Sequence, residues 1–189
     1  MVRIGKPPVT EIAVVLPCYR ETGHILDVIA AIGKEISRIY VVDDACPDKT
    51  GEYVRANCTD KRVEILRQQE NTGVGGATMA GYRKALADGA QIIVKLDGDG
   101  QMDPALIPDL IAPIIDGRAD YTKGNRFYTL DRISHMPRMR IIGNLALSFI
   151  TKLSSGYWNI FDPTNGFTAI HAVATEQLPF DKINNGFFF

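Results

Sequence analysis

Residues 91–104 read QIIVKLDGDGQMDP, and this stretch decides the fold class. A run rich in apolar residues, 91–96, ends at Asp97, and single glycines follow Asp97 and Asp99. A short apolar run bounded by turn residues predicts a strand that is covered on both faces. Pro104 predicts the start of a helix, because a proline in the first turn loses no helical hydrogen bond.

The same alternation of strand and helix continues on both sides of this stretch. Apolar runs predict further strands at residues 11–16, 38–42, 62–66 and 119–123, and helical spacing predicts helices at 23–36, 50–56, 77–87, 104–115 and 137–154. Such alternation is typical of α/β proteins, with a mainly parallel sheet flanked by helices. We therefore expect a single domain over residues 1–189. The aromatic run at its end leads us to expect that the natural domain is truncated here.

The composition excludes several classes of protein. The 189 residues carry a net charge of −1 and are 46% hydrophobic, which is unlike a disordered chain or a general nucleic-acid binder. Three cysteines without a CxxC pair predict reduced thiols in a cytosolic protein, rather than a disulfide framework or a zinc site. The longest apolar candidate, 141–150, is interrupted and much shorter than the roughly 20 residues that a membrane span needs.

Acidic residues follow the predicted strands, at the edge of the sheet where α/β proteins bind ligands. Asp97 and Asp99 are one residue apart, and carboxylate oxygens are the ligands that Mg²⁺ prefers. This DGD turn predicts a site for Mg²⁺ or Mn²⁺; the alternative is a solvated acidic turn. An EF-hand is excluded, because Met102 and Pro108 occupy the positions where that loop needs glycine and glutamate.

A second acidic turn follows the predicted strand 38–42. We expect Asp44 to accept hydrogen bonds from a ribose or a base, whereas Asp48 and Thr50 are expected to cap the next helix. A glycine-rich segment, 71–77 (NTGVGGA), precedes the helix 77–87.

The N–H groups of Gly73, Gly75 and Gly76 can approach an anion closely, although the segment matches neither the dinucleotide fingerprint nor the P-loop. A tight connection between strand and helix is an equal alternative. Residues 118–140 are rich in arginine and lysine, and Arg126 is predicted to turn toward the same edge, where a guanidinium suits phosphate oxygens. The alternative for this stretch is a solvated face.

Taken together, the motifs resemble family 2 glycosyltransferases, and most closely the polyprenyl-phosphate glycosyltransferases similar to dolichol-phosphate mannosyltransferase. In family order they are LPCYRE (16–21), VDDACPDKT (42–50), NTGVGGA (71–77), DGDGQMDP (97–104), GNR (124–126) and DPTNGF (162–167). The resemblance implies a GT-A nucleotide-diphospho-sugar transferase fold. This chain departs from the family at Ala45-Cys46, where Gly-Ser is usual, and at Arg20, where asparagine is common.

The resemblance also implies roles for individual residues. The nucleotide pocket would be lined by Pro17, Tyr19, Glu21 and Asp44, and Asp97 and Asp99 would hold a metal that bridges the diphosphate. Gln101 would lie at the sugar or a phosphate, Arg126 would meet a phosphate, and Asp162 and Gly166 belong to the last motif. Arg138 or Arg140 would bind the phosphate of the acceptor.

The implied reaction is inverting transfer of a sugar from a GDP- or UDP-sugar to a polyprenyl phosphate. Such an acceptor would bring the protein to the cytoplasmic face of a membrane, with the apolar side chains of 141–150 toward the lipid; the alternative is that this helix packs on the sheet. Other functions remain open: a family 2 transferase acting on a saccharide hydroxyl, a phosphoacceptor receiver domain, a dinucleotide-dependent dehydrogenase, and a nucleotide-sugar sensor without activity.

Overall fold

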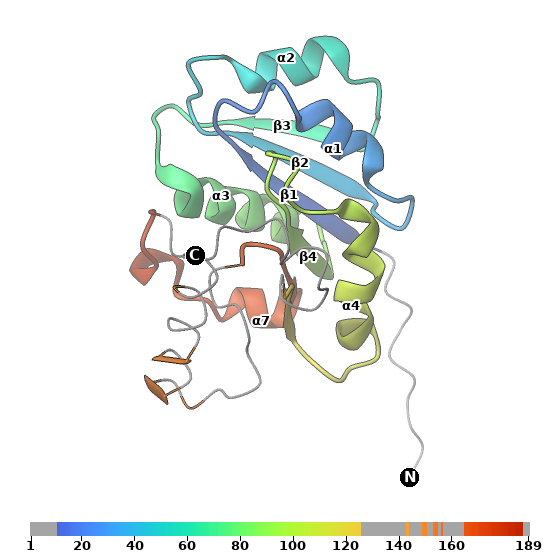
Figure 1. The fold of residues 1–189 in the computed structure, drawn as a ribbon, viewed down its shortest axis with the longest axis vertical. Coiled ribbons are helices and arrows are strands. Elements are labelled where there is room, and N and C mark those ends of the chain that lie inside the picture. Colours follow the sequence, from blue (N-terminus) through green and yellow to red (C-terminus); the bar gives the residue numbers. More distant parts are fainter. Residues whose placement is uncertain are drawn as a thin grey trace.

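The structure is a computed structural model that describes residues 11–125, 143, 149–150, 153–154, 156 and 165–186. In this part of the chain a six-stranded sheet has the order β3-β2-β1-β4-β6-β5 (Figure 1). The strands are β1 (Ile12–Cys18), β2 (Arg38–Asp43), β3 (Val63–Arg67), β4 (Ile92–Lys95), β5 (Tyr121–Lys123) and β6 (Thr168–His171). The first four strands are parallel, and β6 is antiparallel to both β4 and β5. The predicted mainly parallel sheet is thus confirmed.

Helices cover both faces of this sheet. They are α1 (Ile25–Ala31), α2 (Thr50–Asn57), α3 (Gly73–Ala87), α4 (Ile107–Ile115) and α7 (Ala172–Glu176), with short 3-10 turns at Pro104–Leu106 and Phe180–Lys182. Apolar side chains of α1, α2 and α4 pack on one face, and those of α3 pack on the other. Within the described ranges, no helix has the length and apolar character needed to cross a membrane.

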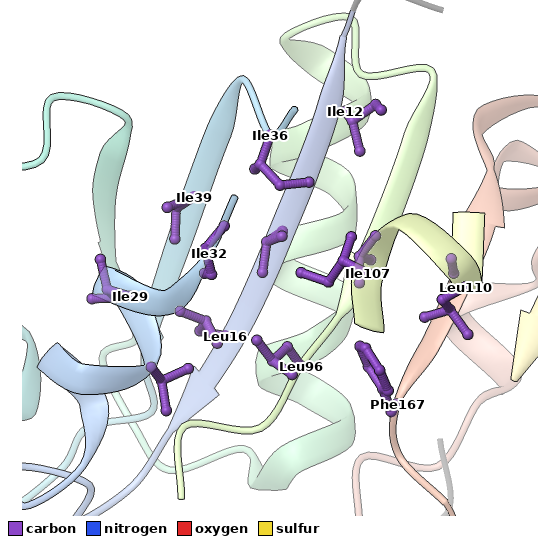
Figure 2. Packing of buried hydrophobic residues seen from close by; sticks show 14 of the residues in the cluster. Ile12, Leu16, Ile29, Ile32, Ile36, Ile39, Leu96, Ile107, Leu110 and Phe167 are labelled. Atoms are coloured by element: carbon purple, nitrogen blue, oxygen red, sulfur yellow. The ribbon is translucent and has the colours of Figure 1, made fainter. Parts of the chain in front are cut away.

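Alternating side chains of the strands fill the two halves of the core. Ile12 and Leu16 of β1 lie in one cluster with the apolar side chains of α1 and α4, among them Ile107 (Figure 2), whereas Ala13 and Val15 face α3. A side chain at Gly81 of α3 would place its Cβ 2.3 Å from Cγ1 of Val15. Glycine at this position therefore lets α3 lie close to the centre of the sheet.

The first strand continues past Pro17, which the sequence pattern predicts as its end. The pairing of β1 with β4 stops at Val15, whose carbonyl accepts the last hydrogen bond, from the N–H of Leu96. Pro17 lies two residues further along, on the side of β1 where β4 has already ended. Its missing N–H therefore removes no hydrogen bond to β4, while β1 continues to pair with β2 as far as Cys18.

The first helix is shorter than predicted. It ends at Ala31, and Ile32 is extended, with ψ of 123°. The loop that follows, 32–36, keeps Ile32 and Ile36 buried, which explains why the apolar spacing resembles a longer helix. The guanidinium of Arg62 holds this loop in place, because it donates hydrogen bonds to the backbone carbonyls of Ile32, Gly33 and Ile36.

Further differences concern helix α3, strand β6 and helix α7. Helix α3 begins at Gly73 rather than Ala77, so the glycine-rich segment forms the first helical turn. Strand β6 and helix α7 were not predicted at all. The helix predicted at 137–154 lies mostly outside the described residues, of which 143, 149–150 and 153–154 are helical.

Candidate functional site

The acidic turn after β4 lies against the turn after β1. A Cβ added at Gly98 would lie 3.2 Å from Sγ of Cys18 and 3.5 Å from Cβ of Glu21. Glycine between the two aspartates thus allows the backbone of the DGD turn to touch the end of β1. This contact brings Asp97 and Asp99 to the same place as Glu21, as the parallel topology predicts.

The charges of Asp97 and Asp99 disfavour ionisation of Glu21. The pKa of Glu21 is raised, first by burial and then by the negative charges of Asp99 and Asp97, while His24 opposes the rise. A carboxylate group that is driven toward its protonated form marks a place where a cation would be stabilised. The electrostatics therefore fit a positively charged ligand between the ends of β1 and β4.

A lysine that sequence reasoning missed already supplies one positive charge. Lys95, the last residue of β4, is only 6% exposed, and its Nζ lies 2.6 Å from Oδ1 of Asp97. A Cβ at Gly166 would lie 2.5 Å from this Nζ and 3.0 Å from Oδ2 of Asp97. Gly166 therefore lies directly against the ion pair, where a larger residue would not fit. The sequence feature that could have revealed this pair is a lysine inside an otherwise apolar strand.

The donor set at this edge suits a hard divalent cation that also has phosphate ligands. Asp97 is partly exposed, and Oδ1 of Asp99 accepts a hydrogen bond from the N–H of Gln101, which holds the turn in shape. Nowhere in the described ranges do three His, Cys, Asp or Glu side chains gather closely enough to hold a metal alone. Mg²⁺ is commonly held by one or two carboxylates plus substrate phosphates and water, so these residues fit that role.

The acidic turn after β2 is used to hold neighbouring backbone. Asp43 accepts hydrogen bonds from the N–H groups of Cys46 and Gly51, at 2.8 and 2.7 Å, and thereby caps α2. The prediction that Asp48 or Thr50 caps α2 is wrong, because the N-cap position is Lys49 and no side chain caps the helix from there. Asp43, at the end of β2, instead accepts the hydrogen bond from the N–H of Gly51 in the first turn of α2.

Asp44 holds the start of α3. Its carboxylate accepts hydrogen bonds from the N–H and the hydroxyl of Thr72 and from the N–H of Gly73, at 2.8 to 2.9 Å. Three bonds use most of the roughly four that a carboxylate accepts. A contact between Asp44 and a nucleoside stays a prediction, and the contact that the structure contains is the one that joins β2 to α3.

The predicted nucleotide-pocket residues of the first motif lie on the turn after β1. Pro17 is buried within β1, while Tyr19 is 43% exposed and the guanidinium of Arg20 lies 5.5 Å from the centre of its ring. The N–H of Arg20 donates to Sγ of Cys46, 3.0 Å away. The first two motifs are therefore joined, and they present one exposed aromatic ring.

Three residues near this junction have left-handed backbone. Arg20, Ala45 and Lys49 have φ of 65°, 51° and 53°. Burial opposes ionisation of the Cys46 thiol, but hydrogen bonds from Thr50 and from the amides of Arg20 and Asp48 outweigh it and lower its pKa. The cysteine thus takes part in the hydrogen bonding of the turn.

The glycine-rich turn is occupied by a distant segment of the chain. The N–H of Gly75 points at the carbonyls of Asn185 and Gly186, both 3.1 Å away, and the N–H of Gly76 donates to Asn185 at 3.3 Å. An anion would have to displace residues 184–186 to reach these amides. The predicted contact of Gly73, Gly75 and Gly76 with the donor therefore remains untested, and their structural role is to seat this segment.

The last two motifs lie side by side. The N–H of Gly124 donates to the carbonyl of Phe167, 2.8 Å away, and a Cβ at Gly124 would lie 3.0 Å from Nδ2 of Asn165. This pairing brings Gly124, the first residue of the 124–126 motif, next to the 165–167 turn, where Gly166 lies beside Asp97. Four predicted site residues lie outside the described residues: Arg126, Arg138, Arg140 and Asp162.

Comparison with known proteins identifies the family of this chain. The sequence model described as glycosyl transferase family 2 matches residues 13–178. The chain belongs to glycosyl transferase family 2. This assignment excludes the receiver-domain and dehydrogenase alternatives.

Curated relatives of this family 2 chain have related names. The UDP-N-acetylglucosamine–dolichyl-phosphate N-acetylglucosaminyltransferase of Methanococcus voltae is 33% identical over 181 residues, which cover 88% of this chain and 72% of the relative. The undecaprenyl-phosphate mannosyltransferase of Micrococcus luteus is 28% identical over 174 residues, 90% of this chain and 70% of the relative.

Solved structures confirm the GT-A fold of this family 2 member. Glucosyl-3-phosphoglycerate synthase of Mycobacterium tuberculosis, crystallised with Mn²⁺, UDP and glucosyl-3-phosphoglycerate, superposes with a TM-score of 0.62 at 21% identity. The match covers 87% of this chain and 57% of that chain. Mannosyl-3-phosphoglycerate synthase of Rubrobacter xylanophilus gives a TM-score of 0.64 at 16% identity, over 86% of this chain and 53% of that chain.

Proposed function

We propose that this glycosyltransferase moves a sugar from a GDP- or UDP-sugar to a polyprenyl phosphate at the cytoplasmic face of a membrane. The observation that carries the donor half is the meeting of Glu21, Asp97 and Asp99 at the carboxyl ends of β1 and β4, where the pKa of Glu21 is raised. The acceptor half is supported by relatives whose names specify dolichyl or undecaprenyl phosphate.

Asp97 and Asp99 would hold Mg²⁺ or Mn²⁺ in this proposal. The fit rests on their oxygen donors, on the repulsion between each of them and Glu21, and on the partial exposure of both aspartates. Bound there, a divalent cation supplies positive charge to the diphosphate that leaves. The solved relative with Mn²⁺ and UDP supports this assignment.

The remaining motif residues would bind the donor. Pro17, Tyr19, Glu21 and Asp44 would line the nucleotide pocket, to which Tyr19 would present its exposed ring and in which Asp44 would meet the nucleoside. Gln101, which is exposed beside Asp99, would lie at the sugar or a phosphate. Arg126, two residues after Gly124 in the same motif, would meet a phosphate.

The chemistry then needs little from the protein at the acceptor. A phosphate oxygen of the lipid attacks the anomeric carbon while the bond from that carbon to the β-phosphate oxygen breaks, and the nucleoside diphosphate leaves. An acceptor phosphate is already anionic, so no general base is required. Attack from the face opposite the leaving group inverts the anomeric configuration.

The acceptor would meet arginines and an apolar surface. Arg138 or Arg140 would bind its phosphate, since a guanidinium pairs with phosphate oxygens bidentately. Further along, Phe149, Ile150 and Leu153 are 56 to 60% exposed in a helical stretch. Apolar side chains left in water at this place suit a lipid tail or the membrane interface.

The proposal is tested by donor binding and by transfer. Asp97→Asn and Asp99→Asn should abolish the part of GDP or UDP affinity that depends on Mn²⁺, measured by calorimetry with and without the metal. Asp109→Asn, an exposed aspartate on α4, is the matched control and should bind as wild type does. Unchanged metal dependence in both site variants would remove Asp97 and Asp99 from the proposed site.

A second assay decides the acceptor. Radiolabelled sugar from GDP-mannose, UDP-glucose or UDP-N-acetylglucosamine should appear in the organic phase when a polyprenyl phosphate is present. Replacing Arg138 and Arg140 together should lower this transfer much more than it lowers donor binding. Transfer to soluble saccharides without any lipid product would instead favour an acceptor hydroxyl.

A further inference from the structure

Lys95 is a buried cation placed directly on a proposed metal ligand. Its Nζ lies 2.6 Å from Oδ1 of Asp97, and the lysine side chain is 8% exposed. Burying an ammonium group is unfavourable unless it is paired, and Asp97 is the ion-pair partner that the described part of the chain provides. This pair uses one oxygen of the carboxylate that the proposed function assigns to the cation.

The surroundings fix the lysine in this position. A Cβ at Gly166 would lie 2.5 Å from Nζ, and the same Cβ would be 3.3 Å from Cε of Met102. Lys95 also lies within a paired strand, opposite Val15 on β1 and opposite Thr168 on β6. The ammonium is therefore enclosed by both the strand pairing and the 165–167 turn, and it remains beside Asp97 before any donor arrives.

We infer that Lys95 competes with the divalent cation for Asp97, so that the metal binds tightly only together with the donor diphosphate. This inference rests on the proposed function, because it requires the metal to bind at Asp97 and Asp99. Without the donor, the ammonium neutralises part of the charge of the three carboxylates and repels a second cation. With the donor, phosphate oxygens add negative charge and complete the oxygen shell. Lys95 is thus a positioning residue that links metal binding to donor binding.

A purely structural lysine would behave differently. If Lys95 only neutralised the partly exposed carboxylate of Asp97, its replacement would change stability but leave the affinity for the metal alone unchanged. If Lys95 instead competes with the cation, removal of its positive charge strengthens metal binding in the absence of nucleotide. The two readings therefore differ in a quantity that can be measured without any transfer activity.

The test is the Mn²⁺ affinity of Lys95→Met, which is measured on the whole chain by electron paramagnetic resonance or calorimetry. Without nucleotide, we expect Mn²⁺ to bind Lys95→Met about tenfold or more tightly than wild type, from loss of a unit charge close to a dication. Saturating GDP or UDP should strengthen Mn²⁺ binding to wild type by a larger factor than to the variant. Lys95→Gln, which keeps a hydrogen-bond donor but no charge, should shift in the same direction and serves if the methionine variant does not fold.

Two controls separate the possible failures. Lys84→Met breaks a lysine–aspartate pair of similar length, 2.7 Å to Asp88, far from the site and should leave Mn²⁺ binding unchanged. In an Asp97→Asn background the effect of Lys95→Met should vanish. Equal Mn²⁺ affinity in wild type and both Lys95 variants would overturn the inference and leave the proposed function standing. If Asp97→Asn binds Mn²⁺ as tightly as wild type does in the presence of GDP or UDP, both the inference and the proposed function are overturned.

Discussion

At the scale of single residues, two of the three departures from the family pattern lie at residues with left-handed backbone. Ala45 and Arg20 have φ of 51° and 65°, and the residues usual in the family at these positions are glycine and asparagine. Those two residue types adopt this conformation with the least strain. The residues of this chain at positions 20 and 45 therefore act on backbone energy.

Replacement of Ala45 by glycine should stabilise the protein. Relief of the left-handed conformation is worth about 1 kcal/mol, partly offset by the greater freedom of glycine in the unfolded chain. Denaturant unfolding of Ala45→Gly should show a higher midpoint at unchanged slope. The same substitution at Ala56, an exposed position in α2, should destabilise by up to about 1 kcal/mol; a loss of stability at both positions would contradict the strain at Ala45.

The carboxylate of Glu21 gives the protein a pH dependence with a defined sign. Its pKa is raised in the folded state by burial and by Asp99 and Asp97, so the folded state binds the proton more tightly than the unfolded state. The corresponding stability is present at acid pH and is lost as the pH rises through the raised pKa. Ionised Glu21 therefore opposes folding at neutral pH.

Glu21→Gln should accordingly be more stable than wild type at pH 7, and the difference should shrink toward pH 4. Chemical denaturation at both values measures this, with the exposed Glu176→Gln as the matched control. A variant less stable than wild type at pH 7, or a difference that grows on acidification, would be evidence against repulsion among the three carboxylates.

At the scale of elements, the start of α3 is a position that local sequence patterns predict wrongly. Three glycines within four residues make a poor helix on propensity alone, so the sequence placed a turn there. The helix nevertheless begins at Gly73, because Asp44 accepts from residues 72 and 73 and residues 184–186 pack on the next turn. Both partners are distant along the chain, and neither is visible in a local pattern.

Gly75→Ala tests this packing. The new Cβ would lie 2.6 Å from the carbonyl oxygen of Asn184 and 2.9 Å from that of Gly186, so residues 184–186 must move away. We expect faster hydrogen exchange at the amides of residues 75 and 76, even though alanine is the better helix former by about 1 kcal/mol. Gly23→Ala, which has no atom within 4 Å of its Cβ, should leave that exchange unchanged. Equal protection in both variants would show that the segment does not need glycine.

Local sequence patterns predicted the structure correctly where a buried strand and the turn after it determine the position of a residue. Apolar runs located β1 to β5, and the DGD turn placed Asp97 and Asp99 correctly beside Glu21. They failed at β6, which has four residues and pairs antiparallel with a strand more than seventy positions earlier. They also failed at Lys95, since a lysine at the end of an apolar strand does not reveal which carboxylate it meets.

At the scale of the whole molecule, the motifs converge because the parallel strands all end at one edge. The turns after β1, β2 and β4 bring together residues from three motifs, and the 165–167 turn enters the same edge from the antiparallel side. The helices on both faces contribute packing, and α3 also contributes the seat for residues 184–186 (Figure 1). One edge of the sheet thus carries the proposed chemistry, and the rest of the domain holds that edge in place.

The position of β6 between β4 and β5 has a consequence for the order of assembly. Strand β5 is paired with β6 and with no other strand of the described chain, so it cannot join the sheet until residues 168–171 have docked on β4. The loop that must close for this is long, and such closure is slow compared with the local βαβ units that precede it. In a pulse-labelled refolding experiment, the amides of β1 and β2 should become protected first, and those of Tyr121–Lys123 should follow together with Thr168–His171. Protection of β5 ahead of β6 would contradict this order. Nascent chains of this protein would accordingly carry an unpaired β5 strand until residues 168–171 have been synthesised.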